Sequence, residues 1–230
     1  MTAYGDLVSR APGRKWAELA WYETARRACA LVGATGFRLS VRGREHIPLS
    51  GPVIFASNHQ SFLDPAFCGV ATGWRPSRPM ARESLFRIVP LGTLLRTLGT
   101  VPVNMEGGAV AALRSAMAEL DAGRAVTLFP EGTRSRDGEL GEFRPGLALL
   151  VRRCRAPVVP LAIDGSFDAW PRHRRLPRLG VPVVVEIGAP ITAGVDESGA
   201  IQAANIVEEV HSAVRDLLAQ ARARRAIMCA

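Results

Sequence analysis

Short apolar runs recur along the chain and, more than any other feature, limit the folds it can adopt. Residues 52–57 (PVIFAS) are partly β-branched and begin after Gly51, which is typical of a buried strand. Further apolar runs at residues 125–129, 158–163 and 183–187 predict additional strands, whereas residues 110–120 carry apolar side chains at helical spacing. Strands interspersed with helices predict an α/β fold.

The composition fits one enzyme-sized domain. The chain has 230 residues, of which 48% are hydrophobic and 22% charged, and this is enough apolar content for one large core. The four cysteines form no CxxC pair and the sequence has no histidine cluster, so it predicts neither a disulfide framework nor a metal site. We expect reduced thiols, as in a cytoplasmic protein.

A histidine and an aspartate follow the first strand, in the stretch Asn58–Asp64 (NHQSFLD). Pro65 comes next, and an Asp-Pro pair suits the start of a helix, so the stretch predicts a strand-to-helix turn. Ligands of α/β sheets gather at the carboxyl ends of strands. His59 and Asp64 could together activate a hydroxyl, because a carboxylate bonded to one imidazole nitrogen fixes the tautomer and stabilises the protonated ring. Taken alone, the spacing also fits a hydrogen-bonded turn histidine and a helix-capping aspartate.

A second loop, Phe129–Ser135 (FPEGTRS), follows the strand predicted at residues 125–129. Gly132 permits close approach of the backbone to a ligand, and the hydroxyl and guanidinium groups that follow it suit a phosphate. A solvated basic turn is the alternative interpretation of this loop.

With both loops in view, the sequence resembles the glycerolipid acyltransferase family of the 1-acyl-glycerol-3-phosphate acyltransferase type. Members of this family move a fatty acyl group from a thioester to a lysophosphatidic acid or a glycerol phosphate. Four blocks in the family's order carry the resemblance, within residues 45–190. They are His59–Asp64 (the HxxxxD motif), Arg82–Val103, Phe129–Ser135, and Ala156–Ile163 with the preceding Phe143–Gly146.

The resemblance implies a single-domain mixed sheet flanked by helices, with His59 as general base and Asp64 as its orienting partner. It also implies that the acceptor phosphate is bound by Glu131, Gly132, Thr133 and Arg134, with Arg82 and Arg144 as nearby basic candidates. An acyl-CoA or acyl carrier protein thioester would be the co-substrate, and neither a cofactor nor a metal is expected. The acceptor would be a lysophospholipid, with 1-acyl-glycerol-3-phosphate giving phosphatidic acid. The second block often ends in an arginine where this sequence has Met105, which leaves the acceptor head group open.

Arginine carries almost all of the net charge of +8, because Lys15 is the only lysine. Such a surface suits phospholipid head groups, phosphorylated substrates or nucleic acid, but the sequence has no recognisable nucleic-acid-binding motif. Near the N-terminus, residues 14–32 predict an amphipathic helix with two tryptophans. Its predicted apolar side comprises Ala17, Ala20, Trp21, Thr24, Ala28, Leu31 and Val32, with Lys15, Tyr22 and Arg26 opposite.

Two interpretations of this helix remain open. It either packs on the core of its own domain or anchors the protein at an anionic membrane surface. No run approaches eighteen apolar residues, and the N-terminus lacks the apolar centre of a signal peptide. We therefore expect an N-terminal amphipathic helix at residues 1–36, which is membrane-interfacial under the second interpretation, and an acyltransferase domain at residues 37–230. The protein would be cytoplasmic and peripherally associated with the inner face of the membrane.

Three other functions remain as alternatives. A lysophospholipid-remodelling acyltransferase would act on a different head group. A serine hydrolase would need an activated serine, but the sequence has no G-x-S-x-G elbow, and Ser57 and Ser61 have no evident second partner. A non-catalytic basic protein that binds membranes is favoured by charge alone.

Overall fold

The fold is built on a seven-stranded mixed sheet. The computed structural model describes residues 10, 12–13, 15–73, 75–103, 108–195, 201–202 and 205–230. The strand order is β1-β7-β6-β2-β5-β3-β4, and β6 and β7 are antiparallel whereas the other neighbouring pairs are parallel. The bounds are β1 (Ser40–Arg42), β2 (Val53–Ser57), β3 (Ser77–Arg82), β4 (Val101–Val103), β5 (Ala125–Leu128), β6 (Val158–Asp164) and β7 (Val184–Ile187). The predicted mixed sheet is confirmed.

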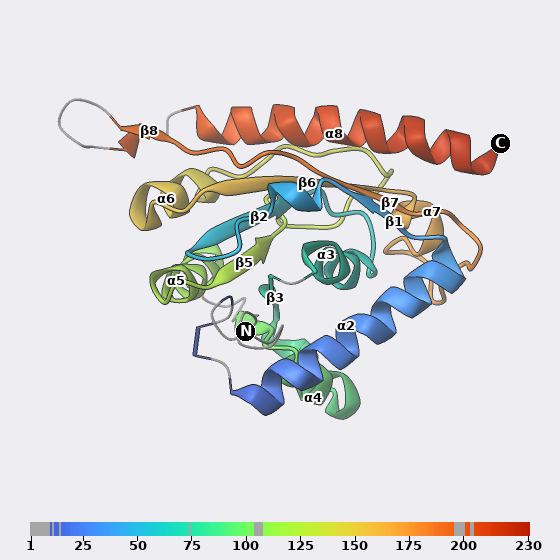
Figure 1. The fold of residues 1–230 in the computed structure, drawn as a ribbon, viewed down its shortest axis with the longest axis horizontal. Coiled ribbons are helices and arrows are strands. Elements are labelled where there is room, and N and C mark those ends of the chain that lie inside the picture. The colour runs from blue at the N-terminus through green and yellow to red at the C-terminus, as the bar shows by residue number, and fades with distance from the viewer. Residues whose placement is uncertain are drawn as a thin grey trace.

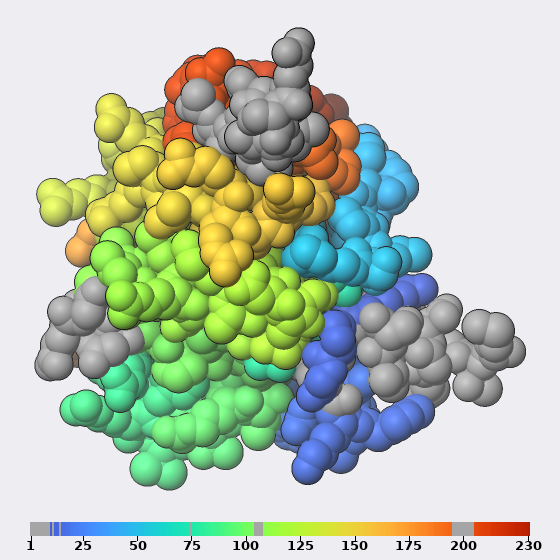
Figure 2. Space-filling model, turned by 90° about the vertical axis from the view of Figure 1, so that its left-hand side faces the viewer, coloured from blue at the N-terminus to red at the C-terminus, as the bar shows by residue number. Residues whose placement is uncertain are grey.

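Helices cover both faces of this sheet (Figure 1). They are α2 (Trp16–Phe37), η1 (Arg44–His46), α3 (Asp64–Thr72), η2 (Glu83–Arg87), α4 (Val89–Thr97), α5 (Gly108–Asp121), α6 (Gly146–Cys154), α7 (Ser166–Ala169) and α8 (Ile206–Cys229), with a short hairpin of β8 (Gly194–Val195) and β9 (Ile201–Gln202) before α8. Helices α5, α6 and α8 cover one face, and α2 and α3 lie on the other. In the side view of Figure 2, α8 in red lies at the top and α2 in blue at the lower right.

Two apolar cores fill the spaces between the layers. In β2, Val53 and Phe55 join one core with Phe67 of α3, whereas Ile54 and Ala56 join the other core with residues of α5, α6 and α8. Successive residues of a strand point to opposite faces, so a strand between two helical layers needs apolar side chains at every position. All five residues of β2 are buried, and this explains why continuous apolar runs predicted the central strands correctly.

The sequence makes two predictions about the far edge of the sheet, one correct and one wrong. Residues 101–103 (VPV) predict an edge strand, because proline cannot donate to a central ladder, and β4 is that edge strand. Residues 74–79 (WRPSRP) predict a loop, but β3 begins at Ser77, and Ser77–Pro79 pair with Ala125–Thr127 of β5. The error arises because the exposed backbone edge of β5 recruits this segment, whose own residues show no strand pattern.

Helix α2 packs on α3 through the side that the sequence analysis had placed away from the core. Leu19, Tyr22 and Glu23 are buried, and Glu23 accepts hydrogen bonds from Arg26 and Arg27. Of the two interpretations of this helix, packing of the predicted apolar side on the core is therefore wrong, because a paired carboxylate and a large aromatic ring can be buried together. The predicted apolar side faces solvent instead. No helix in the described ranges has the length and apolarity needed to cross a bilayer.

Candidate active site

His59 and Asp64 form a hydrogen-bonded pair in the turn between β2 and α3. His59 Nδ1 lies 2.9 Å from Asp64 Oδ2. The same oxygen accepts hydrogen bonds of 2.6 Å from the backbone N–H groups of Gln60 and Ser61, and Asp64 is completely buried. Because a carboxylate only accepts, Nδ1 carries the proton and Nε2 keeps its lone pair. The pair thus has the arrangement of a general base with an orienting partner.

The imidazole of His59 stacks on the ring of Phe129 but remains partly exposed to solvent. Its ring stacks on Phe129 with centroids 4.0 Å apart and planes inclined by 19°, and its side chain is 18% exposed. Within the described part of the chain, no hydrogen bond is formed by Nε2, so an incoming hydroxyl can reach that nitrogen.

Asn58 fixes the point where the chain leaves β2. Its side-chain amide donates to the carbonyl of Ile163 at 2.9 Å, and its Oδ1 accepts the N–H of the same residue at 2.8 Å. Asn58 is 1% exposed. The side chain of Asn58 thus pairs with β6 just after the last backbone pairing of β2. This contact fixes the chain next to His59.

Glu131 braces the backbone of His59. Its Oε1 accepts the His59 N–H at 2.7 Å and its Oε2 accepts the Gly141 N–H at 3.1 Å. Burial raises the pKa of the Glu131 carboxyl, and the two N–H donors partly oppose this rise. Both carboxylate oxygens are therefore occupied by backbone donors, whereas the sequence analysis placed Glu131 among the phosphate-binding residues.

Gly132 makes room for Arg144. Its φ is +72°, and a Cβ there would lie 2.7 Å from Arg144 Nε, so a larger residue would displace the guanidinium. Arg144 Nε donates to the carbonyl of Glu131 at 3.2 Å. The two predicted residues thus lie together. Thr133 is exposed next to them.

Arg134 lies over the ring of Phe62, with its guanidinium carbon 3.5 Å from the ring centroid. Burial lowers the pKa of Arg134, the positive charges of Arg172 and Arg82 lower it further, and the negative charge of Asp64 raises it. Arg134 is therefore within electrostatic range of Arg172 and Arg82, and a bound phosphate would relieve this repulsion. Arg172 was not among the predicted residues at this site.

The two serines of the turn point away from the histidine. Ser57 Oγ donates to the carbonyl of Asn58 and Ser61 Oγ donates to the carbonyl of Trp170. Neither hydroxyl is bonded to His59, so the turn lacks the serine–histidine contact of a serine hydrolase. Met105 lies outside the described residues.

Besides Arg172, three contributors to the site were missed in the sequence. Asn58, Gln60 and Phe129 lie within the quoted motifs, yet their side chains contact backbone carbonyl groups or a ring that only the fold brings close. The sequence feature that could have identified them is their position next to His59 or at the end of the strand at residues 125–129. No group of three or more His, Cys, Asp or Glu side chains in the described ranges is arranged to hold a metal ion.

Comparison with known proteins identifies relatives of one kind. A family model described as "Acyltransferase" matches residues 38–164. The 1-acyl-sn-glycerol-3-phosphate acyltransferase BAT2, chloroplastic, of Brassica napus is 32% identical over 138 residues, which cover 59% of this chain and 40% of that protein. The 1-acyl-sn-glycerol-3-phosphate acyltransferase of Borreliella burgdorferi is 30% identical over 141 residues, which cover 60% of this chain and 56% of that protein.

The fold is shared with a solved structure. The crystal structure of the 1-acyl-sn-glycerophosphate (LPA) acyltransferase PlsC from Thermotoga maritima superposes with a TM-score of 0.72 and covers 95% of this chain and 88% of that chain, at 24% sequence identity. The chain thus spans about half the length of the two relatives matched by sequence but nearly all of this structure.

Proposed function

Since this chain belongs to the acyltransferase family, which residues 38–164 match, we propose that it transfers a fatty acyl group to the free hydroxyl of a lysophospholipid. The donor is an acyl-CoA or an acyl carrier protein thioester. The preferred acceptor is 1-acyl-glycerol-3-phosphate, the substrate class in the names of the two relatives, and the product is phosphatidic acid. The observation that carries the proposal is the His59–Asp64 pair with an accessible Nε2.

In this mechanism His59 is the general base and Asp64 its orienting partner. Nε2 of His59 takes the proton of the acceptor hydroxyl as its oxygen attacks the thioester carbonyl. The carboxylate of Asp64 stabilises the resulting imidazolium. The tetrahedral intermediate then collapses with cleavage of the carbon–sulfur bond, and the imidazolium returns the proton to the leaving thiolate. No acyl-enzyme intermediate is needed.

The guanidinium cluster is proposed to bind the acceptor phosphate. Arg134 and Arg82, both named from the sequence, are joined by Arg172. Arg144 and the backbone around Gly132 and Thr133 complete this side of the site. Holding the phosphate here would keep the hydroxyl near His59 and convert a bimolecular encounter into a positioned reaction.

One assay tests the proposal. Purified protein is incubated with an acyl-CoA and a panel of lysophospholipids that differ in head group, and release of free thiol is followed. We expect acceptor-dependent thiol release that is fastest with 1-acyl-glycerol-3-phosphate. Faster turnover with another head group would favour the remodelling alternative, and tight binding to anionic vesicles without thiol release would favour a non-catalytic protein.

We also propose that the protein is peripherally associated with the cytoplasmic face of a membrane. The exposed side of α2 supports this, because Trp16, Trp21, Leu31 and Val32 are each about half or more exposed there, and such side chains insert at the headgroup boundary. Sedimentation with vesicles containing anionic lipid tests it. Leu31→Ser should weaken binding, whereas Ile227→Ser, an equally exposed apolar site at the end of α8, serves as the matched control.

A further inference from the structure

A loop formed by residues 135–139 touches the His59 turn at two points. The N–H of Ser135 donates to the carbonyl of His59 at 2.7 Å. The side-chain amide of Gln60 donates to the carbonyl of Gly138 at 2.5 Å, and Gln60 is only 2% exposed. The backbone N–H of Gln60 meanwhile donates to Asp64. This loop therefore contacts the same turn that carries the His59–Asp64 pair.

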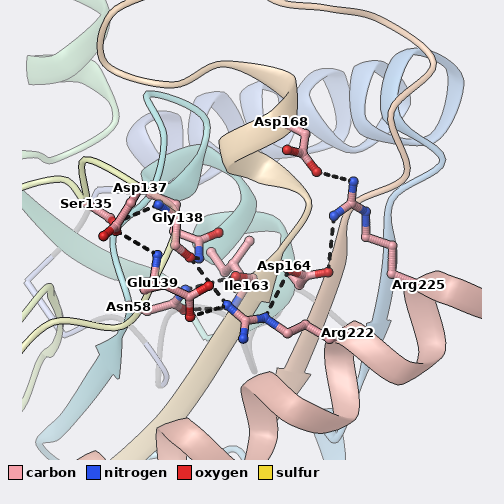
Figure 3. Close-up of polar contacts among 11 residues, drawn as sticks. Asn58, Ser135, Asp137, Gly138, Glu139, Ile163, Asp164, Asp168, Arg222 and Arg225 are labelled. Carbon is pink, nitrogen blue, oxygen red and sulfur yellow. Dashed lines mark hydrogen bonds and ion pairs between the residues drawn. The ribbon is translucent and has the colours of Figure 1, made fainter.

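Arg222, near the C-terminal end of α8, contacts this loop, whereas the neighbouring Arg225 pairs with Asp164 and Asp168 (Figure 3). Arg222 donates to Glu139 Oε2 at 2.8 Å and lies 3.5 Å from the carbonyl oxygen of Gly138. Its Nε also lies 3.9 Å from Asp164 Oδ1. The far end of α8 is thus joined to the His59 turn through one carbonyl group, which both Arg222 and Gln60 contact.

Close packing supports the loop only in part on this side. The ring of Phe167 lies against Gly138, where a Cβ would approach it to 3.1 Å. A cavity of about 370 Å³ also lies between α8 and the loop, lined among others by Gln60, Gly138, Asp164, Arg222 and Arg225. Where a loop borders empty space, its polar contacts contribute more to its position. The Arg222–Glu139 pair is largely exposed, with side chains 43% and 66% accessible, and such pairs contribute little to global stability.

We propose that Gln60 and Arg222 are positioning residues for the reaction. Arg222 fixes the carbonyl of Gly138, that carbonyl holds the side chain of Gln60, and the turn then keeps Asp64 bonded to His59. The inference rests on the proposed acyl transfer but concerns residues outside the reacting groups. A misplaced catalytic pair lowers turnover more than substrate binding, because positioning acts mainly on the reacting atoms.

The test compares Arg222→Ala with Arg224→Ala, a matched change two residues along the same helix. Arg224 pairs with Glu186 and does not contact the 135–139 loop. We expect Arg222→Ala to lower kcat about tenfold with KM changed by less than about twofold. Because the Arg224–Glu186 pair is more buried, Arg224→Ala should lower the urea midpoint of unfolding more, yet leave kcat nearly unchanged.

A second measurement does not depend on activity. Amide hydrogen exchange of Gln60 and Ser61, whose N–H groups donate to Asp64, should become at least about tenfold faster in Arg222→Ala and stay unchanged in Arg224→Ala. Gln60→Leu should lower kcat similarly, and the double variant with Arg222→Ala should lose little more, because both act through one carbonyl.

Unchanged exchange together with kcat within about twofold of wild type in Arg222→Ala would overturn the inference. So would equal losses of kcat in Arg222→Ala and Arg224→Ala, since these would indicate a general effect of α8 on stability. If the wild type releases no thiol with any acceptor, the proposed function fails instead. The exchange comparison then still decides whether Arg222 positions the turn.

Discussion

Replacing Glu131 with glutamine tests the central structural feature of the site, the carboxylate that braces His59. Glu131 accepts the N–H of His59 and the N–H of Gly141, one on each oxygen. Glutamine has one oxygen and one NH2 group, so it can accept only one of these donors. The other N–H would face a donor and remain unsatisfied. We expect Glu131→Gln to fold, but with a displaced His59 turn.

The expected change in the free energy of unfolding of Glu131→Gln is the balance of two opposing contributions. Loss of a hydrogen bond to a charged group costs about 1.5–3 kcal/mol, and a buried donor without a partner adds a cost of about 1–3 kcal/mol. Against this, glutamine carries no charge, and the raised pKa of Glu131 indicates that its ionised form is disfavoured by burial. We expect a net loss of about 1–3 kcal/mol in the free energy of unfolding. If a similar energy is lost from positioning of His59, kcat falls about 5- to 160-fold.

Steady-state kinetics measure the fall in kcat of Glu131→Gln, and urea unfolding measures its loss in free energy of unfolding. The matched control is Glu142→Gln, the same chemical change at an exposed position one residue beyond Gly141, and it should leave both quantities unchanged. The sequence analysis assigned Glu131 to the acceptor phosphate, although two negative groups repel. A variant with normal kcat and a raised KM for the acceptor alone would support that assignment and refute the bracing argument.

Three further predictions follow from the site. His59→Ala and Asp64→Asn should each lower kcat by about two to four orders of magnitude with an unchanged circular dichroism spectrum; more than about a tenth of wild-type turnover in either would exclude that residue from its role. Arg134→Ala should raise KM for a phosphate-bearing acceptor more than for a neutral monoacylglycerol, and equal effects on both would contradict phosphate binding. Burial raises the pKa of Glu131 above 4.5, so the folded protein binds this proton more readily than the unfolded chain. The free energy of unfolding of wild type minus that of Glu131→Gln should therefore decrease as the pH rises from 4.5 through the raised pKa. A difference that rises over this interval would show that the two N–H donors stabilise the carboxylate by more than burial destabilises it, and would contradict the raised pKa.

Much of the fold was predictable because the central strands are buried on both faces. Runs predicted at residues 52–57, 125–129, 158–163 and 183–187 correspond to β2, β5, β6 and β7 within one residue at each end. The His59–Asp64 pair was also predictable from the sequence, since both residues lie in one short turn. The central strands and the His59–Asp64 turn could thus be predicted because each depends mainly on residues that are neighbours in the sequence.

Features that depend on distant partners were not predictable. Arg75 belongs to the arginine-rich composition that suggested a charged surface, yet it is completely buried. Its guanidinium donates to the carbonyls of Arg10 and Gly51, which lie far from it in sequence. Burial without a carboxylate lowers the pKa of Arg75 to about 10. Composition cannot distinguish such an arginine from one that faces a phosphate.

The register of the sheet explains why Glu131 meets His59 although 72 residues separate them. Strands β2 and β5 are parallel neighbours, and their paired residues are offset by the same number, from Val53 with Ala125 to Ala56 with Leu128. Continuing this register by three residues on both strands places Glu131 opposite His59. A slip of one residue would put Pro130 or Gly132 there, and neither has a side chain that accepts a hydrogen bond. The His59 turn and the Glu131 loop are therefore aligned by the β2–β5 ladder at the centre of the sheet. The same register explains why two loops of different sequence begin at the same level of the fold.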